Sequence, residues 1–532
     1  MKSGSVLAIL VLVSAARCCA AQQVLPEFIG VADALDRQTR RGVIPEHNAV
    51  ARLCEVVELY PDGYSVRLRH RLEFHRRLGV PAAGPETPRL RELTRFQNEF
   101  REVEHLLRLA DVRFQLPGFH EDSSPESTVL LAEKARLDVD RLPWIAEQYP
   151  TVALWLRSQE PVLRVIRESV TRSHWYMPVF QSRGSDGGQL PVALQHPSAG
   201  ELLAVMSLLR TSAMFRLGEG QVRAAGTELL TLLRLSRHLQ SALNPHYFTG
   251  MAMESVGSEL CRAWLSSTAV TEADIDEFMA SLQALPVASD PLLYCEQYDR
   301  VVTLELLEFL RRDKEFSLIC LPDPLADQSA VRIVQQVLRQ QSADWEAVAQ
   351  RLNREYDRLQ QVYASADITQ AMLQMDQVTE QWEGAWQQSK SALETGKSVS
   401  QDTVTEYISL RLLLGLPALH RKRGFALGTR IDHSLLQAGC WLRKYQIRMG
   451  DWPETPGEVE QLFGCRLPLD PVSGQSLKYR RTGAAIRFYS VGWNGIDDGG
   501  VRNRMGETAS SADDIEYSLP FSLARPARLP RF

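Results

Sequence analysis

The chain lacks a long apolar run and a strong charge imbalance. Its longest apolar stretch, residues 6–16, is about half of the roughly 20 residues that a membrane-spanning helix needs. Lys and Arg number 60 and Asp and Glu number 65, which gives a net charge of −5. A chain so nearly neutral has no general attraction for nucleic acid, so we expect no nucleic-acid binding. Because the apolar run is short, we also expect no transmembrane span after cleavage of an N-terminal signal.

Signatures of common enzyme mechanisms are also missing. The sequence has no Gly-x-Ser-x-Gly, P-loop, dinucleotide-binding glycine motif or His-Glu-x-x-His. A catalytic triad whose members are dispersed along the chain leaves no such motif, so a hydrolase remains an alternative. The absence of a signature favours a non-enzymatic protein.

The N-terminus resembles a cleavable signal peptide. Lys2 precedes the apolar residues 6–16, and small residues follow up to Ala21. This layout predicts cleavage after Ala21 and a periplasmic or secreted protein.

Cleavage would leave six cysteines, none in a C-x-x-C motif. They are Cys54, Cys261, Cys295, Cys320, Cys440 and Cys465. An oxidising compartment permits disulfides, but the sequence does not choose among the pairings. Only Cys440 and Cys465 fall in one small predicted domain, and buried free thiols are the alternative.

Helical periodicity extends over residues 25–419. It predicts helices at 48–59, 90–109 and 153–171, and a hairpin of two helices at 200–239 around Gly218-Glu219-Gly220. This hairpin is similar to a tetratricopeptide pair, but no second copy follows at a fixed period. Residues 323–393 predict one or two long amphipathic helices. They could present a surface to a protein partner or pack on their own chain, and polar residues 396–405 predict a linker.

The C-terminal part changes character. A helix is expected to end near Met449, and residues 476–481 and 484–491 alternate as two short strands around Thr482-Gly483. The predicted fold is therefore mainly α, built of helical hairpins or a bundle, with a small C-terminal α+β domain that contains a β-hairpin. We divide the chain into a signal peptide (1–21), a helical domain (22–265), long amphipathic helices (266–425) and the α+β domain (426–532).

Short motifs in this last domain occur in the order seen in one family. They are Tyr445, Gly450-Asp451-Trp452-Pro453, Leu467-Pro468-Leu469-Asp470-Pro471, Gly474, Tyr479 and Tyr489-Ser490-Val491-Gly492-Trp493-Asn494-Gly495. The domain resembles the globular part of type II secretion major pseudopilins over about the last fifth of the chain. The family's apolar N-terminal helix is absent and the loop over 500–513 is longer, which argues against assembly into a pseudopilus. This likeness suggests an accessory protein of a secretion or pilus-like system as a further alternative.

The larger helical part is similar to exported bacterial proteins whose C-termini carry the same glycine-rich acidic signature. The motifs that carry this likeness are Asn48-Ala49-Val50, Trp155-Leu156 and Arg216-Leu217-Gly218-Glu219-Gly220. The resemblance implies a fold and no established activity.

A glycine-rich acidic loop is the best candidate site. Its oxygen-bearing side chains are Asn494, Asp497, Asp498, Asp513 and Asp514. Calcium takes six to eight oxygen ligands in a tolerant geometry, which such a loop can supply. The pseudopilin resemblance implies a calcium site in this loop, with Val491 (through its carbonyl), Asn494, Asp498 and Asp514 as the matching positions. The alternative is a turn in which Asn and Asp side chains bond their own backbone.

Four other groups of side chains could form a site. Glu102 and His105 have the spacing of a metal-ligand pair but lack a second copy. The carboxylates Glu296, Asp299, Glu305 and Glu308 are expected on a charged outer face, and His70 and His75 on the surface. Trp144, Trp155, Trp175 and Tyr176 are expected in the core or at an interface. The sequence thus favours an exported scaffold or binding protein whose C-terminal domain calcium stabilises.

Overall fold

A computed structural model describes twelve parts of the chain. They are residues 31–57, 59, 68–81, 87–90, 139–179, 199–241, 243–312, 343–365, 367–395, 399–415, 419–500 and 514–520. The predicted signal peptide, the Glu102–His105 pair, Cys320 and Asp513 lie outside these residues. In the described residues the fold is mainly helical with a small antiparallel sheet near the C-terminus, as the sequence predicted, and this sheet has three strands.

The N-terminal helices pack around the long helix α7 (Pro150–Val170). They are α2 (Val31–Arg40), η2 (Pro45–His47), α3 (Ala49–Leu53) and α4 (Leu68–Leu78). The helix predicted over 48–59 is shorter than expected: after Leu53 the backbone N–H groups of Glu55 and Val56 bond three residues back, to Arg52 and Leu53, in turns. The helix predicted over 153–171 is confirmed as α7.

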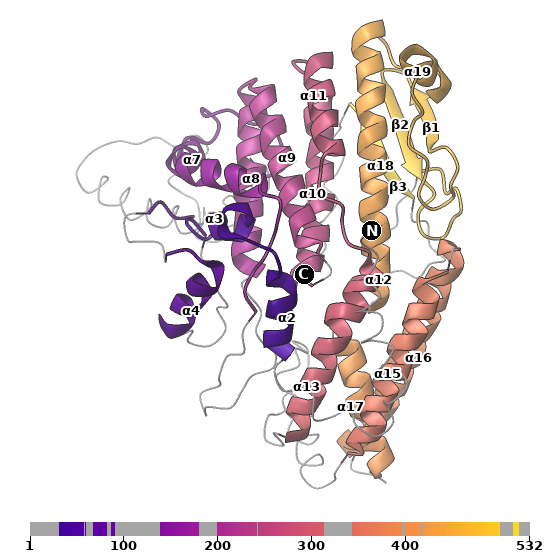
Figure 1. Ribbon diagram of the computed structural model, residues 1–532. Coiled ribbons are helices and arrows are strands. Elements are labelled where there is room, and N and C mark those ends of the chain that lie inside the picture. Colours follow the sequence, from indigo (N-terminus) through magenta and orange to yellow (C-terminus); the bar gives the residue numbers. More distant parts are fainter. Residues whose placement is uncertain are drawn as a thin grey trace, which may run out of the picture.

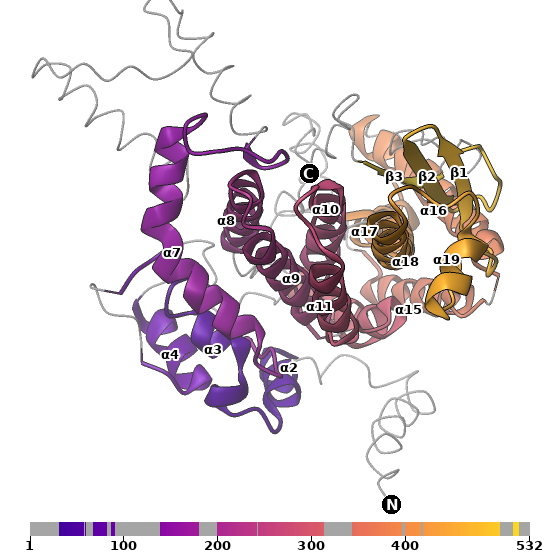
Figure 2. The same ribbon diagram turned by 90° about the horizontal axis from the view of Figure 1, so that it is seen from above.

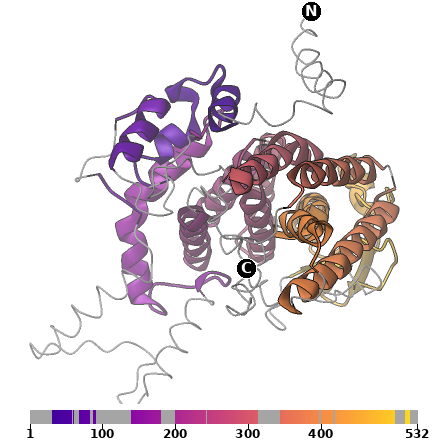
Figure 3. The same ribbon diagram turned by 90° about the horizontal axis from the view of Figure 1, so that it is seen from below.

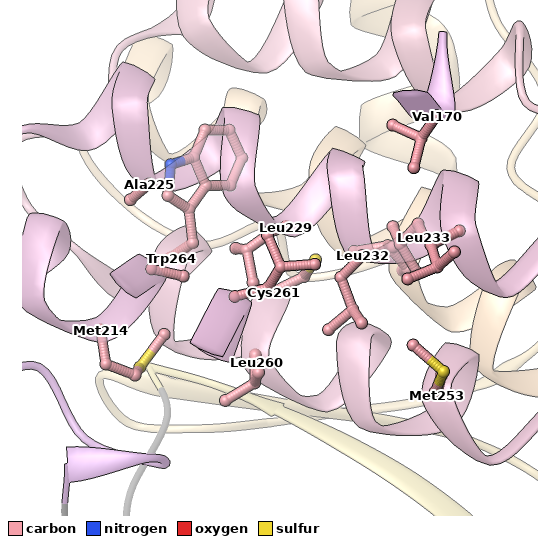
Figure 4. Close-up of a cluster of buried hydrophobic side chains, with 14 of the residues drawn as sticks. Val170, Met214, Ala225, Leu229, Leu232, Leu233, Met253, Leu260, Cys261 and Trp264 are labelled. Atoms are coloured by element: carbon pink, nitrogen blue, oxygen red, sulfur yellow. The ribbon is translucent and has the colours of Figure 1, made fainter. Parts of the chain in front are cut away.

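The predicted hairpin is confirmed as α8 (Ala199–Gly218) and α9 (Val222–Leu239). Two further helices, α10 (Tyr247–Ser266) and α11 (Glu272–Gln283), stand beside it in Figure 1. Glycines on α10 let it approach α9 closely: a Cβ on Gly250 would lie 2.6 Å from the carbonyl oxygen of Ser236. Figure 4 shows the side chains that fill the α9–α10 contact, including Leu229, Leu232 and Trp264.

A second group of helices forms the lower part of the molecule in Figure 1. It contains α12 (Pro291–Tyr294), the π-helical turn η4 (Cys295–Asp299), α13 (Arg300–Arg312), α15 (Trp345–Tyr363), α16 (Ile368–Thr395) and α17 (Gln401–Gly415). Within the described part of the segment predicted as long amphipathic helices, α15 and α16 are two such helices in succession. The linker predicted over 396–405 is wrong from Gln401 onward, because Ser400 accepts the N–H of Thr403 and so starts a helix with polar residues.

The C-terminal part is built on α18 (Leu419–Met449), which ends where predicted. After α19 (Pro456–Phe463), strands β1 (Lys478–Thr482), β2 (Ala485–Ser490) and β3 (Ile515–Leu519) form a sheet in the order β1-β2-β3. The β1–β2 hairpin is confirmed, and the sequence did not predict β3. The sheet packs on α18, where a Cβ on Gly439 would lie 3.2 Å from the Tyr517 ring and 3.3 Å from Phe488.

Two hydrophobic clusters hold these parts together. Figures 2 and 3 show from above and from below how the helices that they join are arranged. The first cluster joins α3, α7–α11 and α18 to the sheet. The second joins α2, the N-terminal end of α10, α13 and α15–α17. Within the described part of the chain, no helix combines the length and apolar character needed to cross a bilayer.

Candidate functional site

The acidic loop begins directly after β2 and turns back over the outer face of the sheet. Gly495 and Gly500 have positive φ values of 70° and 81°, which other residues rarely adopt. A Cβ on Gly500 would lie 3.3 Å from the Tyr489 ring, so the loop passes close to β2. At its far side a Cβ on Gly495 would lie 2.9 Å from the hydroxyl of Thr369, in the first turn of α16.

Two of the predicted ligands bond to their own chain. Asp497 Oδ1 accepts the Tyr489 hydroxyl at 2.9 Å and the Gly499 N–H at 3.1 Å, and Oδ2 lies 3.3 Å from Lys478 Nζ. The Tyr489 hydrogen bond is the main cause that lowers the pKa of Asp497. Asn494 Oδ1 accepts the N–H of Ile496 at 2.7 Å. These contacts are those expected of a turn that side chains stabilise.

Asp514 differs from its neighbours. The residue is fully buried, and its Oδ2 accepts the N–H of Gly500 at 2.7 Å. Its Oδ1 has no hydrogen-bond partner among the described residues. Burial, together with the charges of Asp498 and Asp497, raises the pKa of Asp514 to about 6. A buried carboxylate beside two other acids is the environment that a cation would compensate.

Few groups in this loop could bind a calcium ion. In the parts of the chain that the structure covers, no three acidic, histidine or cysteine side chains converge on a metal position. The remaining donors are Asp514, Asp498, whose Oδ2 accepts from Asn494 at 3.0 Å, and backbone carbonyls such as that of Val491. Calcium accepts such mixed oxygen sets with water completing the shell.

The sequence patterns did not indicate that Asp470 bonds to the start of the acidic loop. Asp470 is almost fully buried and accepts hydrogen bonds from Ser490 Oγ at 2.8 Å and from the N–H of Val491 at 3.1 Å. It thereby joins the turn before β1 to the start of the acidic loop. The Asp-Pro-x-x-Gly pattern at Asp470 signals a turn, and only the fold shows that the same carboxylate reaches β2.

A buried charged network joins α7, α8 and α9. Glu228 is fully buried, and its Oε1 lies 3.2 Å from Arg167 and 3.1 Å from Arg216. Both arginines also contact Glu160 on α7. Burial raises the pKa of Glu228, while the two arginines oppose this effect. The network fixes the positions of three helices.

A second polar cluster lies where α9, α10 and α18 meet. Arg237 pairs with the buried Glu254, and one of its nitrogens lies 3.5 Å from His433 Nδ1. His433 Nε2 lies 3.1 Å from the amide nitrogen of Gln437. Burial, and secondly the charge of Arg237, lower the pKa of His433 to about 4, so the imidazole is neutral near pH 7. A neutral imidazole has one acceptor nitrogen, so it can accept from Arg237 through Nδ1 or from the Gln437 amide nitrogen through Nε2, but not from both.

The expected charged outer face over residues 296–308 is wrong. Asp299, Glu305 and Glu308 are each about 5% exposed or less, because η4 and α13 are packed against α15 and the second cluster. Asp299 lies 3.3 Å from the hydroxyl of Tyr356, which is 2.8 Å from that of Thr303. Asp299 is therefore held by a contact between helices, whereas Glu308 pairs with Arg311 on its own helix at 2.8 Å.

The structure also tests the expectations for His75, for the aromatic residues and for the cysteines. His75 is buried, contrary to the expected surface position. Trp144, Trp155 and Tyr176 are buried in the first cluster, as predicted. Cys54, Cys261, Cys295, Cys440 and Cys465 are free thiols, and all but Cys465 are buried.

Comparison with known proteins returned no match among family models, curated proteins or solved structures.

Proposed function

We propose that the chain is an exported, non-enzymatic scaffold that presents helical surfaces to a protein partner. The observation that supports this proposal is that buried carboxylates form ion pairs between helices. Glu228 pairs with arginines of α7 and α8, and Glu254 pairs with Arg237 of α9. A catalytic carboxylate needs access to a substrate, whereas these carboxylates fix helix positions. Export is supported by the N-terminal pattern of Lys2 and residues 6–16.

Cross-linking in intact cells tests this proposal. A full-length tagged chain should be recovered from the periplasm or the medium, cross-linked to one recurring protein, and the mature chain should not react with fluorophosphonate or other hydrolase probes. Stoichiometric probe labelling of one side chain would favour the hydrolase alternative instead. Recovery of the uncleaved chain from the cytoplasm would contradict export.

We also propose that a calcium ion stabilises the C-terminal domain through Asp514, Asp498 and backbone carbonyls. The support is the fully buried Asp514, whose Oδ1 has no partner among the described residues. Calcium would supply only charge compensation and cross-linking of the loop. Millimolar chelator should lower the melting temperature of the mature chain, and Asp514→Ala should lower it equally and abolish the chelator effect.

Glu516→Gln is the matched control, because Glu516 lies on β3 two residues away and pairs with Arg487 outside the loop. This variant should keep the full chelator response. A wild-type melting temperature that chelator leaves unchanged would rule out the calcium proposal.

Two alternatives can be tested separately. A long helix, α18, packed on an antiparallel sheet supports a secretion or pilus-like accessory protein, for which co-purification with pilin-like proteins is the test. The hydrolase alternative is tested by the probe labelling described above.

A further inference from the structure

Two exposed histidines lie side by side where η2 meets the segment that follows α7. The ring centres of His47 and His174 are 6.5 Å apart, and the two ring planes are within 12° of parallel. Both residues are exposed, whereas the other four histidines whose side chains the structure describes are buried or half-buried. In the described part of the chain, the exposed imidazoles therefore form a pair.

The backbone beneath this pair is fixed by hydrogen bonds. The N–H of His174 donates to the carbonyl of His47 at 3.0 Å, and its carbonyl accepts the N–H of Ala49 at 2.8 Å. The side chain of Asn48 bonds both the N–H and the carbonyl of Tyr176, each at 2.9 Å. The helices that adjoin these segments, α3 and α7, lie side by side in Figure 2. Two segments distant in the sequence thus hold the attachment points of both rings in place.

A neighbouring hydroxyl group orients one of the rings. Ser173 Oγ lies 2.8 Å from His174 Nδ1. When the imidazole donates from Nδ1 to this oxygen, its lone pair is at Nε2. Histidines that bind metals usually donate their second ring N–H to such a partner, which fixes both the tautomer and the ring orientation. Ser173 therefore occupies the position of a supporting residue for a metal ligand.

We propose that His47 and His174 bind one divalent ion of borderline softness, Zn²⁺ or Cu²⁺, through one nitrogen of each ring. Imidazole suits these ions, whereas calcium takes oxygen ligands. At metal–nitrogen distances of about 2.0–2.1 Å, the centres of two bound rings are roughly 5 Å apart, so the exposed rings need to approach by roughly 1–2 Å. Water completes the coordination shell. The site is separate from the acidic loop and does not depend on the function proposed above.

Calorimetric titration of the untagged mature chain with zinc chloride, and separately with copper sulfate, tests the pair. Excess calcium is present throughout, so that the acidic loop does not contribute. One equivalent of either ion should bind saturably. His47→Gln and His174→Gln should each weaken this binding at least about tenfold, because a single ring loses the high effective concentration of the second. Ser173→Ala should weaken it less than either histidine variant, because it removes only the orienting hydrogen bond.

Electron paramagnetic resonance of the copper-loaded chain counts the bound rings. The wild type should show coupling to two imidazoles, and each histidine variant to one. His433→Gln is the matched control, because it removes a half-buried imidazole next to Arg237 and should leave both titrations unchanged. Since His47 and His174 are exposed, neither variant should change the melting temperature without metal.

Three results would overturn the proposal. The first is the absence of saturable binding. The second is weaker binding in only one of the two histidine variants, which would show an ion held by a single imidazole. The third is wild-type affinity in the His47→Gln/His174→Gln double variant, which would place the ion elsewhere on the chain.

Discussion

Buried ionisable groups in this protein differ mainly in what surrounds them. Glu228 faces two arginines, His433 faces one arginine, and Asp514 faces other acids. Arginines favour the charged form of a carboxylate and the neutral form of an imidazole, whereas neighbouring acids favour a protonated carboxyl or a bound cation. The same burial thus has three different consequences.

Removing the carboxylate of Glu228 should be strongly destabilising. Glu228→Ala leaves Arg167 and Arg216 without their buried partner, and we expect the free energy of unfolding to fall by about 3–5 kcal/mol. Urea denaturation followed by circular dichroism measures this change. The control is Glu259→Ala, whose side chain is 44% exposed and lies 3.4 Å from Arg262; it should cost less than about 1 kcal/mol. Equal losses would contradict a special role for the network.

His433 should make stability depend on acid pH. In the unfolded chain the imidazole takes up a proton near pH 6.5, but in the folded protein only near pH 4. Its contribution is therefore complete above pH 6.5 and is lost as the pH falls toward 4, by about 2–3 kcal/mol. The charged groups near the His433 imidazole are Arg237 and its ion-pair partner Glu254.

Urea titrations at pH 7 and pH 4.5 check this prediction. His433→Gln cannot take up a proton, so it should lose less stability than wild type between the two pH values. Identical pH dependence in the two proteins would show that His433 does not titrate in this way.

At the scale of elements, glycines set how closely helices approach. A Cβ on Gly250 would lie 2.6 Å from the carbonyl oxygen of Ser236 and 2.8 Å from Leu239 Cβ, whereas a Cβ on Gly428 of α18 would meet no atom of another element within 4 Å among the described residues. Both are helical glycines, so their intrinsic helix propensity is the same. They differ only in whether another helix is packed against the glycine.

Alanine at these two positions should therefore have opposite effects. Gly250→Ala should force α9 and α10 apart and cost about 1–3 kcal/mol. Gly428→Ala should stabilise the protein by about 0.5–1 kcal/mol, since it only restricts the unfolded chain and favours the helix. Thermal unfolding of both variants measures the difference, and a change of the same sign in both would contradict the packing explanation.

At the scale of the whole molecule, the sheet shares its core with the helices. Phe488 and Tyr517 belong to the first cluster, and the Tyr517 hydroxyl lies 3.2 Å from the carbonyl oxygen of Ser258 on α10. Strands and helices far apart in the sequence therefore stabilise each other.

Damage to the sheet should consequently reach α10. Phe488→Ala should cost about 3–5 kcal/mol, because it leaves a cavity between the sheet and α18. Hydrogen exchange should then show loss of protection in the sheet and in α10 together. Arg480→Ala, on the exposed face of β1, should leave both protected. Independent exchange of residues 478–519 with α10 intact would contradict a shared core.

Much of the fold could be predicted from local patterns. The apolar spacing of α7, α8 and α9 and the alternation of β1 and β2 depend only on residues close in the chain. Burial of Asp299 and Glu305 could not be predicted, because it depends on α15 packing against η4 and α13. The strand β3 was missed because a five-residue strand acquires its identity from pairing with β2.

By itself, the sequence determined the helical class, the helix hairpins and the composition of the acidic loop, since periodicity and glycine content are local properties. Only the tertiary structure decided which charged groups are buried, that Asp497 and Asn494 bond within the loop while Asp514 keeps an oxygen without a partner among the described residues, and that His47 and His174 lie side by side. The physical reason is that solvation and pairing depend on neighbours brought from distant parts of the chain.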